Sequence, residues 1–474
     1  MEESLLKKHH IEYVTVPTPV VSVPESSPEL SVAVLRGRQD RTCRRMLADG
    51  LDFVVVYADR EHCANFAWLV GFDPRFEEAA AILTSDGMLT MILGNENLTM
   101  PDYLGVEGTT VHFPTFSLLN QPRSGVRPFG QILAECGIDG GKSVGICGWK
   151  YYTPEDGCSP ESFEVPHWIV EAVKEAVRQS GTKAAGTVVN AAPLFMSPVD
   201  GLRTILEPEQ IAVYEYACCL VSKAYLDLLA SLRPGMTERQ LAMAFTSGGY
   251  PQSVHAMLSS GEKATWGLTS PSDRTVALGD FLTSAYGLKG ALIARAAFVA
   301  SSKEDLPSAC RWWMKEVAEP YFRAAVLWYE SMHVGARAAD VFSLVEAEFP
   351  SGRFGWTLNP GHFIGDDEWV SSPFSRGSGA VLKSGSYLQF DLIPDPPGPQ
   401  WGANMEDGFV VADESLRARL ASASPQIVKR FARRRAYLQD TLGIRVSEDL
   451  LPMSDLAGFY TPLLMERNKA FVVS

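Results

Sequence analysis

The sequence predicts a mixed α/β protein that folds as two domains. Its 474 residues exceed what one hydrophobic core usually supports, and 46% of them are hydrophobic, which is enough for packed cores. Strand-like apolar runs dominate the first part of the chain, whereas a long stretch with helical spacing of apolar residues opens the second part. We expect an α/β domain over residues 1–200 and a further domain over residues 201–474.

Local patterns predict the elements of the first domain. Residues 51–57, "LDFVVVY", form an apolar, β-branched run typical of a buried strand. Residues 79–93, "AAAILTSDGMLTMIL", place two such runs around a Ser-Asp-Gly turn, as strands joined in a hairpin do. Residues 163–180 carry apolar side chains at helical spacing, so strands and helices are mixed in this domain.

The second domain begins with a predicted helix over residues 205–232, which has Pro208 and acidic residues in its first turn. It ends at "RPGMTERQLA", where Pro234 and Gly235 stop one helix and Thr237 can cap the next. A similar helix, turn and helix pattern recurs at residues 332–349, about a hundred residues later. This repetition indicates two similar α/β halves.

Several strand-like segments of the second domain hold a polar residue within an apolar run. A buried polar group costs free energy unless it is paired, so such residues belong either to a structural network or to a functional site. The segments are "RTVALGDFLTSAYG", "ALIARAAFVA", "SGSYLQFDLIP" and "NMEDGFVVAD".

Charge and composition exclude several classes of function. The chain has 42 basic and 56 acidic residues, a net charge of -14, which disfavours nucleic acids and anionic membranes as partners. No apolar run approaches the roughly 20 residues that cross a bilayer, and the N-terminus lacks the order of a signal peptide, so we expect a cytoplasmic protein. The eight cysteines include no C-x-x-C pair, and we expect reduced thiols.

Taken in order, these segments resemble the pita-bread family, which includes creatinase, aminopeptidase P and prolidase. The resemblance covers nearly the whole chain and implies a creatinase-like N-terminal α/β domain, then a pita-bread domain of two pseudo-symmetric α/β halves, in a homodimer. The fragments that carry it are "LDFVVVYADREHCANFAWLVGF", "LRTILEPEQIAVYEYA", "RPGMTERQLA", "LGDFLTSAYG", "GHFIG", "SGSYLQFDLIP" and "NMEDGFVVAD".

The peptidases of this family hold two divalent metal ions with two aspartates, a histidine and two glutamates. By resemblance, His362 in "GHFIG" falls on the histidine, and Glu406 in "NMEDG" falls on the second glutamate. Asp391 falls where the first glutamate normally stands. These residues are therefore the predicted centre of the site, with His362 as its proton carrier.

The two metal-binding aspartates have no counterpart. Ala285 occupies the first position, and the second falls among Leu292, Ile293 and Ala294. Since these side chains cannot bind a cation, we expect a divergent member of the family without a dinuclear metal centre. One ion on the remaining histidine and carboxylates stays open as an alternative, since three ligands can hold zinc.

Further residues near the motif are candidates for substrate binding. Two buried carboxylates repel each other unless a cation lies between them, and Arg295, a metal ion or a cationic substrate could supply it. Glu368 and Trp369, just after His362, could form the pocket wall, although "DDEW" is also a common composition for a solvated turn. A loop histidine can likewise serve only as a structural hydrogen-bond donor.

These observations lead to one main functional hypothesis and two alternatives. We expect a metal-independent, creatinase-like hydrolase or lyase, without a cofactor, that cleaves a C–N bond in a small cationic substrate bearing a guanidino or amino group. Asp391, Glu406, Arg295, Glu368 and Trp369 would bind that substrate. The alternatives are a catalytically silent relative that acts as a binding protein, and a residual Xaa-Pro peptidase with one metal ion.

Overall fold

The computed structural model describes residues 9–178, 186–267, 269–396 and 401–474. The chain divides into two compact units, Glu29–Thr204 and a larger unit that joins Ile205–Ser474 to the chain's beginning as far as Pro28. The beginning joins the larger unit because β1 (Ile11–Thr15) pairs antiparallel with β15 (Lys469–Val473). Composition gave no indication of this pairing between the ends of the chain.

The smaller unit contains a mixed sheet with the strand order β5-β4-β3-β2-β6-β7. The predicted strand at 51–57 is β2, and the predicted hairpin is β3 and β4, whose turn places Gly87 at φ 99°, a conformation that favours glycine. The strands are β2 (Phe53–Ala58), β3 (Ala79–Thr84), β4 (Leu89–Leu93), β5 (Thr109–His112), β6 (Ser143–Cys147) and β7 (Thr187–Asn190).

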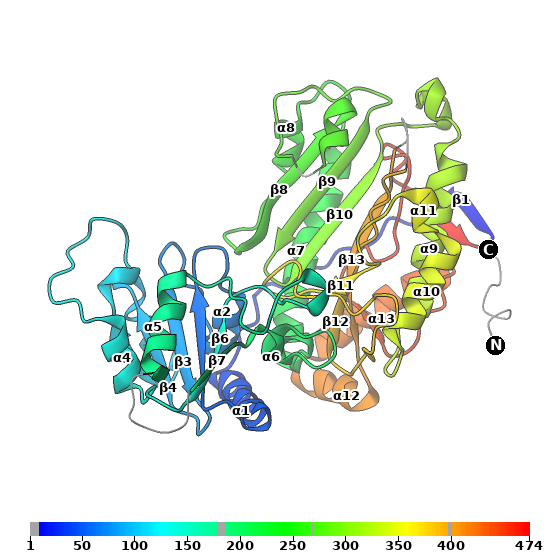
Figure 1. The fold of residues 1–474 in the computed structure, drawn as a ribbon. Coiled ribbons are helices and arrows are strands. Elements are labelled where there is room, and N and C mark those ends of the chain that lie inside the picture. The colour runs from blue at the N-terminus through cyan, green and yellow to red at the C-terminus, as the bar shows by residue number, and fades with distance from the viewer. Residues whose placement is uncertain (1–8, 179–185, 268, 397–400) are drawn as a thin grey trace. The chain divides into compact units, whose positions relative to one another are not determined.

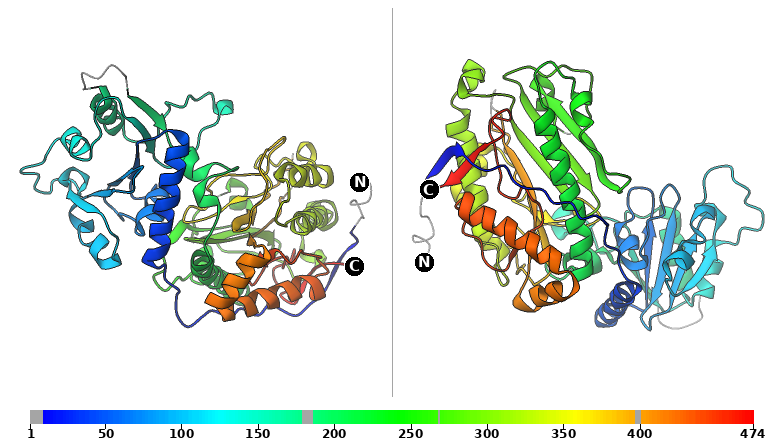
Figure 2. Two further views of the ribbon diagram at one scale, coloured as in Figure 1. Left: turned by 90° about the horizontal axis from the view of Figure 1, so that it is seen from below. Right: turned by 180° about the vertical axis from the view of Figure 1, so that it is seen from behind.

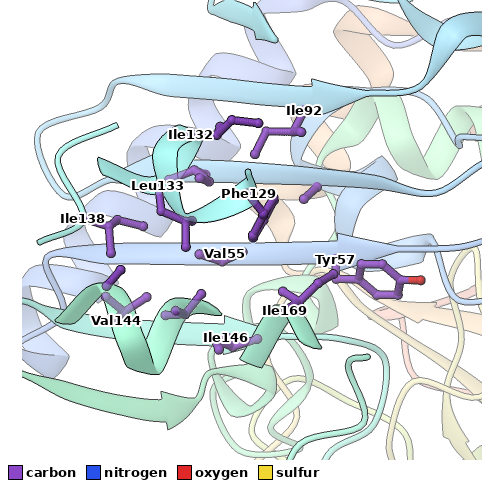
Figure 3. Packing of buried hydrophobic residues seen from close by; sticks show 14 of the residues in the cluster. Val55, Tyr57, Ile92, Phe129, Ile132, Leu133, Ile138, Val144, Ile146 and Ile169 are labelled. Carbon is purple, nitrogen blue, oxygen red and sulfur yellow. The ribbon is translucent and has the colours of Figure 1, made fainter. Parts of the chain in front are cut away.

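Helices α4 and α5 supply apolar side chains to the core of this unit. Figure 3 shows Phe129 and Leu133 of α4 and Ile169 of α5 beside Val55 of the central strand β2. Each fully buried side chain of this size contributes about 1.5–3 kcal/mol. The helices are α1 (Val32–Asp49), α2 (Ala64–Val70), α3 (Met100–Leu104), α4 (Phe129–Glu135), α5 (His167–Arg178) and α6 (Ala192–Met196).

The larger unit contains an antiparallel sheet with the order β11-β12-β13-β10-β9-β8 (Figure 1). A further strand, β14, pairs with β13. The strands are β8 (Gln252–Ser260), β9 (Phe281–Leu288), β10 (Ala291–Phe298), β11 (His362–Phe363), β12 (Ser386–Phe390), β13 (Asn404–Val411) and β14 (Leu450–Pro452). The four strand-like segments with internal polar residues contain β9, β10, β12 and β13.

Long helices pack against this sheet, and two of them occupy equivalent places. Helix α7 packs on β9 and β10, whereas α9 packs on β12 and β13, with the Trp328 and Phe390 ring centroids 5.5 Å apart. The helices are α7 (Pro208–Ser231), α8 (Glu238–Ala242), α9 (Glu319–Glu330), α10 (Ala338–Glu348), α11 (Ser351–Phe354), α12 (Glu414–Ala423) and α13 (Pro425–Ala436).

The turns that follow α7 and α9 confirm the predicted duplication. Gly235 N–H donates to Val276 O at 2.8 Å, and Gly335 N–H, a hundred residues later, donates to Leu382 O at 2.9 Å. The predicted cap also forms, since Thr237 Oγ1 accepts from Gln240 N–H at 3.2 Å. The mixed α/β architecture with two pseudo-symmetric halves is therefore confirmed.

The stretch between β1 and α1 runs along the outside of the larger unit, where Figure 2 shows it in dark blue. Pro17 O accepts from Tyr437 Oη at 2.8 Å, and Ser22 N–H donates to Asp455 Oδ2 at 3.4 Å. The eight cysteines are free thiols. Among the described helices, none combines the length and apolar character that crossing a bilayer would require.

Candidate active site

The candidate site lies on one face of the larger unit's sheet, where strand register gathers its polar side chains. His362 of β11 pairs with Gln389 of β12, and Glu406 of β13 pairs with Ala294 of β10. Side chains alternate between the faces of a strand, so Asp391, two residues after Gln389, lies on the same side as His362. The polar positions within apolar runs thus converge from three neighbouring strands.

Three carboxylates surround the imidazole of His362. Its Nε2 lies 3.6 Å from Glu406 Oε1, 3.8 Å from Glu368 Oε1 and 3.9 Å from Asp391 Oδ2. The His362 side chain is fully buried, and those of Asp391 and Glu406 are 5% and 4% exposed, whereas that of Glu368 is 30% exposed. Glu368 is therefore the carboxylate of this group that faces solvent.

Several buried atoms of the site have no hydrogen-bond partner among the described residues. His362 Nδ1 lies 3.1 Å from Phe363 O, which assigns a proton to Nδ1 and leaves Nε2 directed at the carboxylates. The unpartnered atoms are His362 Nε2, Asp391 Oδ1, Glu406 Oε1, Gln389 Oε1 and Asn404 Oδ1. Apart from the imidazole nitrogen they are all acceptors, so the site is suited to a ligand that brings hydrogen-bond donors or positive charge.

The raised pKa values of the two buried carboxyl groups also indicate a functional site. Burial, and then the neighbouring Glu406, raise the pKa of Asp391 well above its usual range. Burial and the charge of Glu368 raise the pKa of Glu406 likewise. Such clusters of carboxyl groups with raised pKa values are characteristic of functional sites, because packing for stability alone would avoid them.

The positions of the two missing metal-binding aspartates lie side by side on this face. Ala285 of β9 pairs with Ala294 of β10, which in turn pairs with Glu406. Of the three residues that sequence left open for the second aspartate, Leu292 and Ala294 lie on this face of β10, whereas Ile293 faces away. Neither of these side chains nor that of Ala285 has an oxygen atom that could bridge two ions, so the residues present do not fit a dinuclear metal centre.

The prediction that Arg295 binds substrate is wrong for this geometry. Arg295 follows Ala294 on β10, so its side chain points to the opposite face of the sheet. There its Nη2 donates to Asp407 Oδ2 at 2.8 Å and to Leu456 O at 3.1 Å. Asp407, which sequence reasoning did not single out, has a pKa raised to about 6 by burial, against the effect of Arg295.

Trp369 lies beside the imidazole, stacked with His362 at a centroid distance of 4.2 Å and an interplanar angle of 19°. One face of the indole is thus occupied by His362, and the expected stacking on a substrate cation can use only the other. The structure therefore brings His362, Asp391, Glu406, Glu368 and Trp369 together and places Arg295 on the other face of the sheet. That this group of residues binds a substrate stays a prediction.

The turn that carries Glu368 and Trp369 is held from two other elements. Tyr214 Oη on α7 donates to Asp366 Oδ1 at 2.9 Å, and Gly290 N–H in the β9–β10 turn donates to Gly365 O at 2.8 Å. Sequence reasoning missed Tyr214, because 152 positions separate it from Asp366 and no local pattern marks the contact.

This chain resembles known peptidases in sequence and in fold. No protein-family model matches the chain. Among curated proteins it is 22% identical over 314 residues to the uncharacterized peptidase YqhT of Bacillus subtilis (strain 168), covering 59% of this chain and 85% of that protein.

Solved structures of peptidases share the fold over most of their length. A prolidase from Thermococcus sibiricus has a TM-score of 0.61 and 19% identity, covering 80% of this chain and 94% of that one. Dipeptidase PepE from Mycobacterium ulcerans has a TM-score of 0.60 and 18% identity, covering 81% and 95%. An aminopeptidase P variant from Escherichia coli has a TM-score of 0.57 and 17% identity, covering 84% and 100%. The chain therefore has the pita-bread fold of prolidases and aminopeptidases P, as the resemblance of its sequence segments predicted.

Proposed function

We propose that this protein is a metal-independent hydrolase that cleaves a C–N bond in a small cationic substrate bound at His362. One observation carries the proposal: Asp391, Glu406 and Glu368 converge on one buried imidazole, and several of their neighbouring acceptor atoms lack partners. Within the described residues, His362 is the only basic side chain within 4.0 Å of these carboxylates. A cationic substrate would supply the missing charge.

The buried carboxylates are assigned to binding. Asp391 and Glu406 can accept charge-assisted hydrogen bonds from an ammonium or guanidinium group, and such bonds are about twice as strong as neutral ones. A bound cation would also favour their ionised forms, which burial and mutual repulsion disfavour in its absence. Substrate affinity should therefore depend on both residues.

His362 is assigned to proton transfer. Imidazole is a common general acid in catalysis, and the Nε2 of His362 faces the position between the carboxylates where the substrate nitrogen would lie. In the proposed step the oxygen of a water molecule bonds to the substrate carbon, the C–N bond breaks, and the nitrogen leaves with a proton from His362. A proton of the attacking water then restores the charged imidazole.

The solved structures named above that share this fold are peptidases, and by analogy this chain is proposed to hydrolyse a C–N bond. The proposed difference from a dinuclear metallopeptidase is that this chain needs no metal ion, because Ala285 and Ala294 provide no ligand for a second ion beside Glu406. Nothing in this mechanism is routed through a metal ion.

The test is a thermal-shift screen of guanidino compounds, amino acids and Xaa-Pro dipeptides, in the presence of a chelator, with His362→Ala and Glu406→Gln alongside. A ligand at a hundred times its Kd stabilises the folded protein by about 2.7 kcal/mol, which is easily detected. We expect cationic compounds to stabilise the wild type, to lose that effect in Glu406→Gln, and to be hydrolysed without metal. Binding without turnover would instead indicate a binding protein, and turnover only of Xaa-Pro dipeptides with added metal would refute the proposal.

A further inference from the structure

We infer that a pocket between α12 and α13 binds a small organic acid, a molecule with an apolar body and one carboxylate group. The pocket has a volume of about 410 Å³, which lies within the range of small-molecule sites. None of the residues that line it belongs to the candidate active site. The inference therefore goes beyond the proposed function and does not depend on it.

Two helices and a strand form the walls of this pocket. Only Ser424 separates α12 from α13, and the two helices, orange in Figure 2, pack against each other. Strand β14 packs against α13 and contributes Leu451. The start of α12 is fixed by Asp413, whose Oδ1 accepts from Leu416 N–H at 2.8 Å. Because its walls are regular elements, the pocket exists before a ligand binds.

The floor of the pocket is apolar. Leu420 of α12, Phe431 of α13 and Leu451 of β14 line it, and each of these residues is at most 3% exposed. Ala432 and Ala436 of α13 also line it, and their short side chains leave the space open between the helices. An apolar group placed on this floor would be removed from water, which favours binding.

Arg435 supplies a positive charge at one end of this floor. It lies roughly 10 Å along the axis of α13 from Val428, which lines the pocket near the start of the helix, at about 1.5 Å per residue. The pocket thus has an extended apolar part and a cationic part. A carboxylate at Arg435 would leave the rest of the ligand to follow the helix toward Val428.

The guanidinium of Arg435 has hydrogen-bonding capacity that the protein does not use. Its Nη2 donates to Glu448 O at 2.6 Å, whereas its Nε is buried and has no hydrogen-bond partner among the described residues. Burial, and then the neighbouring charge of Arg417, lower the pKa of Arg435. An anion bound here would oppose both effects and would accept charge-assisted hydrogen bonds.

Arg417, the other arginine of the pocket, is already paired. Its Nη1 donates to Asp449 Oδ1 at 2.8 Å and to Ala412 O at 2.7 Å. Arg435 is therefore the cation that remains for a ligand. Asp440 also lines the pocket, and a second acidic group on the ligand would meet its charge. A ligand with one negative charge fits this arrangement better than a ligand with two.

The experiment is calorimetric titration of the full chain with octanoate, in parallel with octanamide, which has the same chain without the charge, and suberate, which carries two carboxylates. We expect saturable binding of one octanoate per chain and much weaker binding of the other two compounds. Arg435→Met should weaken octanoate binding about tenfold or more, because a hydrogen bond to a charged group is lost. Arg419→Met removes the same charge from an exposed position of α12 outside the pocket and should leave the affinity within about twofold.

Two further variants separate a loss of the site from a loss of folding. Arg435→Lys keeps the charge and should retain part of the affinity, whereas Ala432→Trp, at an exposed position, should fill the pocket and abolish binding. Thermal unfolding of each variant without ligand checks that it folds. Binding without saturation, equal affinity for octanoate and octanamide, or unchanged affinity in Arg435→Met or Ala432→Trp would each overturn the inference. Equal losses in Arg419→Met and Arg435→Met would also overturn it, because they would indicate attraction by net charge alone.

Discussion

Replacement of Asp391 by Asn should stabilise the metal-free protein at neutral and alkaline pH but not in acid. Burial and Glu406 raise the pKa of Asp391 well above its ordinary value of 3.8. The folded chain therefore retains a proton at pH values where the unfolded chain has lost it. Because the folded state binds more protons, the free energy of unfolding falls as pH rises from about 4 through the raised pKa.

The magnitude follows from the environment of Asp391. Its Oδ1 is buried without a partner, and an unsatisfied buried polar group costs about 1–3 kcal/mol, more when it is charged. Asn has nearly the same shape, cannot ionise, and can donate to the neighbouring carboxylate. We expect Asp391→Asn to gain about 1–3 kcal/mol at pH 8 and little or nothing near pH 4.

Thermal unfolding at both pH values, with chelator present, measures the effect. Each kcal/mol should shift Tm by about 2–4 °C for a unit of this size. Asp395→Asn, an exposed carboxylate in the next segment, is the control and should change Tm little at either pH. A loss of stability in Asp391→Asn at pH 8, or an equal gain at both pH values, would refute the electrostatic reasoning.

Further predictions address other contacts. Once a substrate is known, His362→Ala should lower turnover at saturating substrate by roughly 10² to 10⁴, and a change of only a few-fold in steady-state kinetics would remove it as the acid. Arg295→Ala should destabilise the fold by about 3–5 kcal/mol in denaturant unfolding because Asp407 is left unpaired, and Arg295→Met with Asp407→Leu should recover most of the loss. Tyr214→Phe should lower the free energy of unfolding by about 0.5–1.5 kcal/mol, and unchanged stability in denaturant unfolding would show that its bond to Asp366 does not hold the turn. Elemental analysis of protein purified without chelator should give well under two ions per chain, and two stoichiometric ions would restore a dinuclear site.

The fold was predictable where local patterns determine structure. The apolar run of β2, the glycine turn between β3 and β4, and the cap at Thr237 depend on neighbouring residues, and each forms as expected. The pairing of β1 with β15 was not predictable in this way. Its partners stand at opposite ends of the chain, and neither segment carries a pattern that specifies the other.

Sequence motifs predicted the residues at the centre of the candidate site. The residues that the prediction missed are placed by contacts that motifs do not encode. The segments "GHFIG" and "NMEDG" identified His362 and Glu406, whose Nε2 and Oε1 atoms lie 3.6 Å apart. Tyr214 could not be found, because its contact with Asp366 depends on the packing of α7 against the sheet. The stacking of Trp369 on His362 likewise depends on the course of a turn.

The placement of Arg295, by contrast, could have been derived from the sequence. If Ala294 occupies the position of an aspartate that faces the site, strand alternation requires the next residue, Arg295, to face away. The same argument places Asp407 on the far face, since it follows Glu406. The two residues then share that face on strands that the structure pairs directly, and their 2.8 Å ion pair is the consequence. Strand alternation thus places Glu406 at the site and the Arg295–Asp407 ion pair behind it. Arg295, the only arginine within the described strands β8 to β14, therefore supplies no cation to the site.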